Sequence, residues 1–395
     1  MAMKKICAVA YTYYLSDPRV RREAEALAQR GDQVCCICLD DSERDRQIRG
    51  VRLYRIPLRR YRGTHFIFYM ASYVVFFGLA SLVLTFLTFW KGLQIVHVHT
   101  MPDFMVFASA LPRLLGVKVI LDIHDTMPEL YAEKFDISFD HPLIRIIKQV
   151  EVLSAQFAHR VITVSEPVKN LLATHGIPPA KIAVLMNLAD DSIFYPRVSH
   201  RKSEETFRLM YHGTVTRRHG IDVALQAVAQ VRQDIPKIRF DVYGNGDYLT
   251  EAMSLSSRLG LDGCVFFNQA FIPIEELPDR IEGADVGIVP IRNDRATRYM
   301  LPVKLLEYLA MEKPTVVSRI EVVEYYMDCA TVEFAEPENP QSLAEGIKKL
   351  YYSVERRAEL KANARRFKQR YCWSRQKETF FKVIDDVSPV KVCLS

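Results

Sequence analysis

Several short patterns that would assign a function at once are missing from this sequence. The first strand, loop and helix, expected over residues 5–30, contain no G-x-G-x-x-G, so a dinucleotide-binding fingerprint is absent. The eight cysteines do not form two C-x-x-C pairs, and several lie in apolar strands, which favours buried reduced thiols. Residues 1–10 lack a cationic segment followed by a long apolar run and a cleavage site. These absences predict a cytosolic chain without a secretory signal.

Charge is modest in amount and uneven in distribution. The 395 residues carry a formal net charge of +6, and they are numerous enough for two or three domains with a sizeable core. Arginine is concentrated between residues 44 and 62. No recognisable nucleic-acid-binding module accompanies this basic segment, so nucleic acid is not an expected partner.

Residues 66–90 contain no charged side chain. About 20 apolar residues suffice to cross a bilayer, so this segment is a candidate membrane span. Ile95–His99 reads as the next strand of the same sheet, however, and a span would place that strand on the wrong side of the membrane. We therefore expect a helix that lies on or dips into the inner leaflet, where the neighbouring arginines favour anionic lipid. The alternative is a long apolar helix packed within its domain.

Strands and helices alternate along the chain. Lys5–Ala10 and Gln33–Leu39 read as strands on either side of a helix at residues 17–30, which is typical of a parallel α/β unit. A polar stretch at Ser199–Glu205 interrupts the alternation, and a strand at Arg208–Tyr211 restarts it. The pattern predicts two α/β domains.

Histidines occur in two of the expected strands. His124 follows a strand at residues 117–123, where the active groups of open parallel sheets commonly lie, although a single histidine is more often structural. His97 and His99 point to one face of their strand, as metal ligands do. No third or fourth ligand is visible in the sequence, so we expect a structural role for this pair and no metal site.

The most informative stretch runs from Arg298 to Ser318. Pro302 suits the start of a helix over Val303–Met311, whose free N–H groups and positive dipole end suit a phosphate. Lys304 adds a mobile positive charge, and Glu307, three residues later, can accept hydrogen bonds from two vicinal hydroxyls. One helix could thus hold the diphosphate and ribose of a nucleotide. The alternative is an ordinary surface Lys–Glu pair.

The segment LPVKLLEYLAMEKPTVVS resembles the donor-binding segment of the family-4 retaining glycosyltransferases. Members of that family have the GT-B fold, two Rossmann-like parallel-sheet domains that face each other across a cleft. Their usual motif is Glu, seven residues, then a second Glu; Glu307 matches the second position, whereas the first is Tyr299. The sequence is similar to the branch with Pro-x-Lys-x-x-Glu-Tyr, and the missing acid weakens the usual contact to the donor sugar.

Two other segments carry the resemblance in the first half of the chain. TYYLSDPRVRREAEALAQRGDQV resembles the opening of many members, where the loop faces the acceptor side, although Asp17 would also serve simply as a helix cap. ILDIHDTMPELY resembles the H-D-x-x-P-E version of the segment whose histidine contacts the donor sugar. The resemblance implies that His124 and Glu307 are catalytic and that the acceptor-side residues are Asp17, Arg19, Asp125 and Glu129.

The loop at residues 212–220 corresponds to a diphosphate-binding loop in the family. The Arg and Lys that clamp the diphosphate there fall on Thr214 and His219 here, so Arg217 or Arg218 would supply the charge, with Arg218 preferred. The resemblance implies donor contacts from Lys304, Arg218, Gly213, Thr214, Arg217, Gly244, Asn268, Pro302 and Val303.

The resemblance covers nearly the whole chain and predicts its organisation. Residues 1–193 would form the acceptor and membrane domain, residues 194–372 the nucleotide-sugar domain, and residues 373–395 a helix that crosses back to the first domain.

The resemblance also implies the reaction. A hexosyl or N-acetylhexosaminyl group would pass with retention from a UDP- or GDP-linked sugar to a saccharide or lipid-linked acceptor, without metal or other cofactor, in cell-surface polysaccharide or glycolipid assembly. The enzyme would lie on the cytoplasmic face of a membrane. One alternative is a non-catalytic partner subunit that kept the fold. Another is a nucleotide-sugar epimerase or phosphorylase on the same fold.

Overall fold

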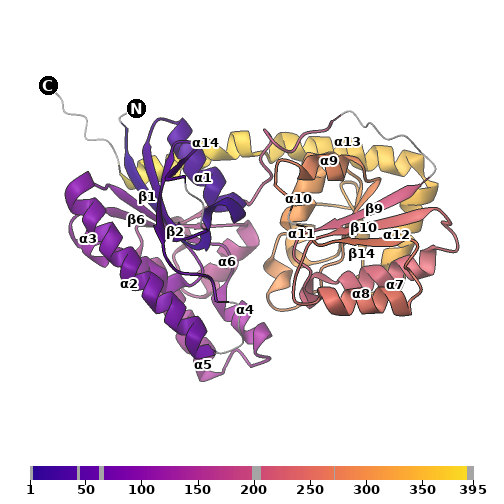
Figure 1. The fold of residues 1–395 in the computed structure, drawn as a ribbon, viewed down its shortest axis with the longest axis horizontal. Coiled ribbons are helices and arrows are strands. Elements are labelled where there is room, and N and C mark those ends of the chain that lie inside the picture. The colour runs from indigo at the N-terminus through magenta and orange to yellow at the C-terminus, as the bar shows by residue number, and fades with distance from the viewer. Residues whose placement is uncertain (1–2, 42–44, 62–65, 198–205, 271, 389–395) are drawn as a thin grey trace. The chain divides into compact units, whose positions relative to one another are not determined.

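The computed structural model describes residues 3–41, 45–61, 66–197, 206–270 and 272–388 (Figure 1). The chain forms two compact units, one of Met1–Asn187 with Gln376–Ser395 and one of Leu188–Arg375. The division falls a few residues before the predicted boundary at 193, because the chain leaves the first sheet at Val184. Each unit is a sheet with helices on both faces, so the α/β prediction is confirmed.

The first unit contains an eight-stranded sheet in the order β3-β4-β2-β1-β5-β6-β7-β8. All neighbouring pairs are parallel except β3 with β4. The central strands are mostly apolar, as expected for strands that helices cover on both faces. The strands are β1 (Lys5–Tyr13), β2 (Gln33–Leu39), β3 (Gln47–Ile48), β4 (Val51–Ile56), β5 (Ile95–His99), β6 (Lys118–Ile123), β7 (Arg160–Thr163) and β8 (Ile182–Val184).

Several helices of this unit begin at a residue whose side chain caps the first turn. The side chain of Asp17 accepts a hydrogen bond from the Val20 amide at 3.2 Å, and Pro18 occupies the first position of α1. The helices are α1 (Pro18–Gln29), α2 (Phe66–Lys91), α3 (Ala110–Leu114), α4 (Met127–Lys134), α5 (Pro142–Phe157), α6 (Glu166–Thr174) and α14 (Trp373–Val387), the last of which starts in the second unit.

Helix α2 is the apolar segment that the sequence marked as a membrane candidate. Residues 70–91 are long and apolar enough to cross a membrane, with a mean hydropathy of 2.1. One face packs into the first unit through the buried side chains of Tyr73, Phe76, Ala80, Leu84 and Leu87. One side of the helix therefore packs within its domain. The opposite face is exposed.

The second unit contains a six-stranded sheet in the order β11-β10-β9-β12-β13-β14, with every neighbouring pair parallel. Its strands are β9 (Phe207–His212), β10 (Ile238–Tyr243), β11 (Val265–Asn268), β12 (Val286–Val289), β13 (Thr315–Ser318) and β14 (Glu333–Ala335). Its helices are α7 (Ile221–Val231), α8 (Leu249–Arg258), α9 (Leu277–Glu282), α10 (Val303–Ala310), α11 (Glu321–Tyr326), α12 (Pro340–Tyr352) and α13 (Val354–Arg370).

The C-terminal helix α14 completes the core of the first unit. Phe380 and Ile384 are fully buried, and the Phe380 ring lies 5.7 Å from the ring of His97 on β5. The Nζ of Lys4 donates to the Asp385 carboxylate at 2.5 Å, at the start of β1. The two ends of the chain therefore contribute to the same unit.

A buried ionic cluster joins three helical segments of the first unit. His175, just after α6, lies 2.6 Å from Glu151 Oε1 on α5 and 3.3 Å from Glu129 Oε1 on α4. Burial alone would lower the pKa of His175, but the hydrogen bonds and charges of the two carboxylates outweigh it and raise the pKa to about 9. The charged histidine thus stabilises the folded state.

This cluster generates a pH prediction. Because the folded pKa of about 9 lies above the ordinary value of 6.5, the stabilisation is complete below pH 6.5 and is lost as the pH rises through 9. Between pH 6.5 and pH 9.5, the free energy of unfolding of the wild type should fall by up to about 3 kcal/mol relative to that of His175→Gln. Urea unfolding of both proteins at the two pH values measures this, and a wild-type-minus-variant difference that is independent of pH would contradict it.

Candidate functional site

The candidate donor site lies at the carboxyl edge of the second sheet, where three strand ends run side by side. The amide of Gly213, after β9, donates to the Tyr243 carbonyl at 2.9 Å. The amide of Gly244, after β10, donates to the Asn268 carbonyl at the end of β11 at 3.0 Å. Loops at this edge of an open parallel sheet commonly bind ligands. The predicted donor residues Gly213, Gly244 and Asn268 are thus neighbours.

Glycine is required here because the loops touch through their backbones. A Cβ on Gly244 would lie 1.9 Å from the Gly213 carbonyl oxygen, and one on Gly246 would lie 2.2 Å from the Val215 carbonyl oxygen. Gly244 also has a φ of +151°, which L side chains rarely adopt. The Asn268 side chain is used in its own turn, where Oδ1 accepts from the Ala270 amide at 3.0 Å.

The start of α10 faces this edge, and Pro302 is its N-cap. Val303 and Lys304 occupy the first two helical positions, whose N–H groups have no acceptor within a helix. The Nζ of Lys304 lies 3.8 Å from the centre of the Tyr211 ring, and a Cβ on Gly213 would be 3.4 Å from Lys304 Cε. Burial lowers the pKa of Lys304 to about 7, although the charge of Glu307 opposes the shift. Phosphate would favour the charged form.

Glu307 lies one turn further along α10 and is bonded on one side. Its Oε2 lies 2.5 Å from His212 Nε2 at the end of β9. The other ring nitrogen, Nδ1, lies 3.0 Å from the hydroxyl of Tyr308, which donates to the Met210 carbonyl at 2.8 Å. His212 was not predicted from the sequence. The sequence feature that could have indicated it is its position at the end of a strand, immediately before the glycine of the predicted phosphate loop.

The polar groups of the loop after β9 differ in whether they already take part in hydrogen bonds. The Thr214 carbonyl accepts from the Tyr211 hydroxyl at 2.6 Å and lies 2.8 Å from His219 Nδ1. Burial and the nearby Lys304 charge lower the pKa of His219 to about 3, so this histidine is neutral and does not replace a lysine. The guanidinium groups of Arg217 and Arg218 donate no hydrogen bond to any residue that the structure describes, which leaves both available for an anion.

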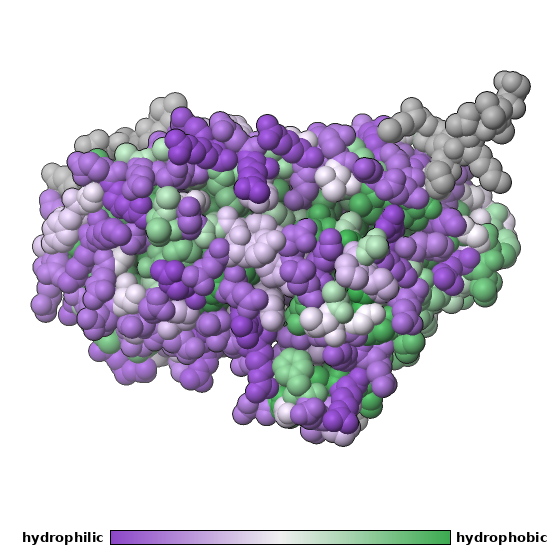
Figure 2. All heavy atoms as spheres, turned by 180° about the vertical axis from the view of Figure 1, so that it is seen from behind, coloured by the Kyte–Doolittle hydropathy of each residue, from purple (hydrophilic) through white to green (hydrophobic). Residues whose placement is uncertain are grey.

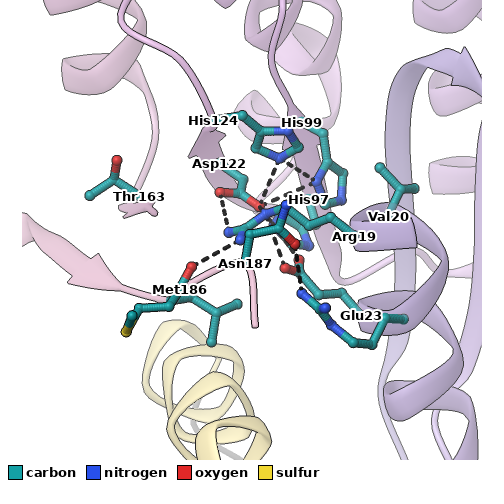
Figure 3. A network of polar contacts seen from close by, with 12 residues as sticks. Arg19, Val20, Glu23, His97, His99, Asp122, His124, Thr163, Met186 and Asn187 are labelled. Atoms are coloured by element: carbon teal, nitrogen blue, oxygen red, sulfur yellow. Dashed lines mark hydrogen bonds and ion pairs between the residues drawn. The ribbon is translucent and has the colours of Figure 1, made fainter. Parts of the chain in front are cut away.

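Of the predicted acceptor-side residues, Arg19 belongs to a buried polar network in the first unit (Figure 3). Arg19 is 2% exposed and donates to both oxygens of Asp122, at 3.0 and 2.9 Å, and to the Leu185 carbonyl at 2.9 Å. Burial alone would raise the pKa of Asp122, but the charges of Arg19 and His124 hold it well below its usual value. Arg19 therefore ties the start of α1 to the ends of β6 and β8, and its contact with an acceptor stays a prediction.

His124 is the accessible end of this network. Its Nε2 lies 3.2 Å from Asp122 Oδ2 and 3.3 Å from His99 Nδ1. Burial alone would lower the pKa of His124, but the charge and hydrogen bond of Asp122 raise it. The histidine is thus held in one orientation at the strand end, and its contact with the donor sugar stays a prediction.

The other acceptor-side residues are placed differently. Asp17 is half-buried as the cap of α1, and Asp125 is half-buried beside His124. Glu129 is only 3% exposed and bonded to His175, so in this structure it holds α4 in place. Direct contacts of these three residues with an acceptor stay predictions.

Four side chains of the network could in principle hold a metal ion. The ligand atoms of Glu23, His97, His99 and Asp122 lie within 4.8 Å of one another, so the two histidines have the third and fourth partners that the sequence did not reveal. Both carboxylates are also paired with Arg19, whose Nε lies 3.2 Å from Glu23 Oε1. The guanidinium already supplies positive charge beside both carboxylates. A structural role for the two histidines stays a prediction.

The chain matches two known protein families, one in each of its two structural units. Residues 16–187 match the family described as "Glycosyl transferase 4-like domain", and residues 206–353 match "Glycosyl transferases group 1". One subunit of the phosphatidylinositol N-acetylglucosaminyltransferase of Arabidopsis thaliana is 25% identical over 224 residues, 55% of this chain and 46% of that protein. The chain thus spans about half the length of this curated relative.

Solved structures share the fold over the full chain. Sucrose-phosphate synthase from Thermosynechococcus elongatus has a TM-score of 0.77 at 17% identity and covers 97% of this chain and 99% of its own. Anabaena Alr3699/HepE in complex with UDP-glucose has a TM-score of 0.73 at 13% identity, with coverage of 96% and 99%. The two parallel sheets and these likenesses identify the fold as GT-B, as the sequence predicted. With its two matched domains in succession, the chain belongs to the glycosyltransferases, a glycosyl transferase 4-like domain followed by a glycosyl transferases group 1 domain.

Proposed function

We propose that this glycosyltransferase takes its sugar from a nucleoside-diphosphate sugar bound at the start of α10. The observation that carries the proposal is the placement of Lys304 and Glu307 beside the glycine-containing loops at the carboxyl edge of the second sheet. The N–H groups in the first turn of α10, Lys304, Arg217 and Arg218 would receive the diphosphate, and Glu307 the ribose. The UDP-glucose bound to the Anabaena structure supports a donor of this class.

In the proposed reaction the departing diphosphate is stabilised by charges that are already in position. The dipole of α10, Lys304 and Arg218 act where negative charge develops, which is preorganised electrostatic stabilisation. No metal is invoked. The proposed stereochemistry is retention, with His124 orienting a hexosyl or N-acetylhexosaminyl group. The leaving phosphate would take the acceptor proton.

We further propose that the acceptor is carried by a lipid and that the exposed face of α2 rests on an anionic membrane surface on the cytoplasmic side. The exposed side chains of α2 recur every three or four residues, and all of them up to Trp90 are apolar. They include Phe68, Val75, Leu79, Leu82, Phe86, Phe89 and Trp90. Figure 2 shows hydrophobic residues, in green, at the edge of the first unit.

Positive charge flanks the apolar face of α2 at both ends. Arg59 and Arg60 are exposed before the helix, and Lys91 is exposed as its last residue. Basic groups beside an apolar helix face complement anionic headgroups. The lipid in the name of the Arabidopsis relative, phosphatidylinositol, is consistent with such an acceptor.

Donor binding is the first prediction to test. UDP, GDP, CDP and ADP are compared by thermal shift, because a ligand at 100 times its dissociation constant adds about 2.7 kcal/mol to the folded state. Glu307→Ala and Lys304→Ala should each abolish the shift and lower transfer more than about tenfold, as expected for lost charge-assisted contacts. Glu345→Ala and Lys361→Ala, at exposed helical positions, are the matched controls.

Other outcomes discriminate the alternatives. Near-normal transfer in both site variants would reject the assignment of the donor site. A thermal shift without transfer to any acceptor would point to a non-catalytic partner subunit. Conversion of the donor sugar without an acceptor would point to an epimerase or phosphorylase.

Proton uptake is the second prediction. With a pKa of about 7, Lys304 is mostly neutral in the free protein at pH 8, and a bound diphosphate should recharge it. Binding at pH 8 should therefore take up protons, which calorimetry detects as a heat that differs between HEPES and Tris buffers. In Lys304→Arg, whose charge is permanent, the uptake should be smaller. Equal uptake in wild type and Lys304→Arg would contradict this proton assignment.

Membrane binding is the third prediction. Wild-type protein should sediment with vesicles that contain anionic phospholipid and dissociate as salt increases. The double variant Leu82→Glu/Phe86→Glu should reduce vesicle binding at least about tenfold, because two charges are placed on the apolar face. Val354→Glu, at another exposed apolar position, is the control. Wild type that stays in the supernatant with anionic vesicles would reject the membrane proposal without affecting the donor site.

A further inference from the structure

We infer that His212 is a positioning residue that ties down one oxygen of Glu307 and leaves the other for the ribose hydroxyls of the donor. The inference rests on the proposed function and adds to it the reason why the carboxylate is presented in one orientation. The contact is Nε2 to Oε2 at 2.5 Å, between the end of β9 and the second turn of α10. His212 is 4% exposed, so little water competes for the bond.

Tyr308 fixes the other side of the histidine ring. Its hydroxyl donates to the Met210 carbonyl at 2.8 Å and lies 3.0 Å from His212 Nδ1, and the two rings meet edge to face at 4.8 Å. The Tyr308 ring lies so close to β12 that a Cβ on Gly287 would be 2.5 Å from Cδ2. The phenol is therefore held on three sides and provides a fixed acceptor for Nδ1–H.

The donors and acceptors of Met210, Tyr308, His212 and Glu307 determine where the protons between these groups lie. The single hydroxyl proton of Tyr308 is used on the Met210 carbonyl, so the phenol oxygen must accept from Nδ1–H of His212. Nε2 of His212 and Oε2 of Glu307 are close enough that a second proton must lie between them. In either location of that proton, Oε2 is occupied and the carboxyl group cannot rotate freely.

The other oxygen of Glu307 is left for a ligand. Oε1 makes no hydrogen bond to any residue within the described ranges, and it is not sealed from solvent. Lys304, one turn earlier on α10, lies beside the glycine loop, where a Cβ on Gly213 would be 3.4 Å from Lys304 Cε. A ribose hydroxyl bound at Oε1 would therefore have an acceptor held in place before the nucleotide arrives, which reduces the entropy lost on binding.

A matched pair of variants separates the two ring nitrogens. The amide nitrogen of Gln reaches the position of Nε2, so His212→Gln keeps a donor toward Glu307. The amide nitrogen of Asn reaches only the position of Nδ1, so His212→Asn keeps the bond to Tyr308 and releases the carboxylate. A residue that merely filled space would not distinguish the two variants, and thermal unfolding checks that both fold.

The readout is discrimination between ribose and deoxyribose. Dissociation constants are measured for UDP and GDP and for their 2′-deoxy and 3′-deoxy counterparts with wild type, His212→Gln and His212→Asn. Wild type should prefer the ribose form of its nucleotide by at least about tenfold, since a site built to hydrogen-bond a hydroxyl rejects the analogue that lacks it. His212→Gln should keep most of that ratio, and His212→Asn should bring it close to one.

Three results would overturn the inference. If wild type binds neither nucleotide, the proposed donor site fails and the inference fails with it. If wild type binds one of them and His212→Asn discriminates as well as wild type, the inference alone fails. If both folded variants lose the discrimination equally, the role of Nε2 in holding Glu307 is rejected.

Discussion

Charges withdrawn from water must be paired, and this constraint organises the polar ends of both sheets. In the first unit the Arg19 guanidinium is surrounded by Asp122, Glu23 and a backbone carbonyl, and three histidines complete the group. In the second unit Glu307 is paired with His212, whereas Lys304 rests on the face of an aromatic ring. The difference matters because oppositely charged groups that are paired hold the backbone in place, whereas a cation beside an aromatic ring can still attract an anionic ligand.

Apolar packing and backbone contact make these pairings possible. Parallel strands end at one edge of their sheet, so side chains that are distant in sequence meet there. At the second sheet the approach is closer still, because Gly244 touches the Gly213 carbonyl and no side chain intervenes. The glycines of this edge also allow a ligand to approach the backbone closely.

Much of this architecture could be predicted from the sequence, and the reasons are local. The strands at Gln33–Leu39 and Ile95–His99 and the helix start at Pro302–Val303 were predicted from local patterns, and the structure has them at those residues. The pairs that define the sites were not predicted. Arg19 and Asp122 are 103 residues apart, and His212 and Glu307 are 95 apart. Such pairs depend on strand order and on the rotation of each helix, which a single sequence does not encode in short patterns.

Helix α2 shows the same dependence on tertiary context. Its composition is apolar on every side, so periodicity could not separate the face that packs on the sheet from the face that does not. Only the position of the sheet distinguishes Phe76, which is fully buried, from Val75, which is exposed.

The placement of α14 has a consequence for biosynthesis. Its buried Phe380 and Ile384 belong to a core whose other members come from the first 187 residues. A ribosome delivers the second unit before it delivers these side chains, so the second unit can complete its core while the first still lacks part of its own. During translation the unit made first is therefore the one finished last, and its unsealed apolar surface is what a chaperone would meet.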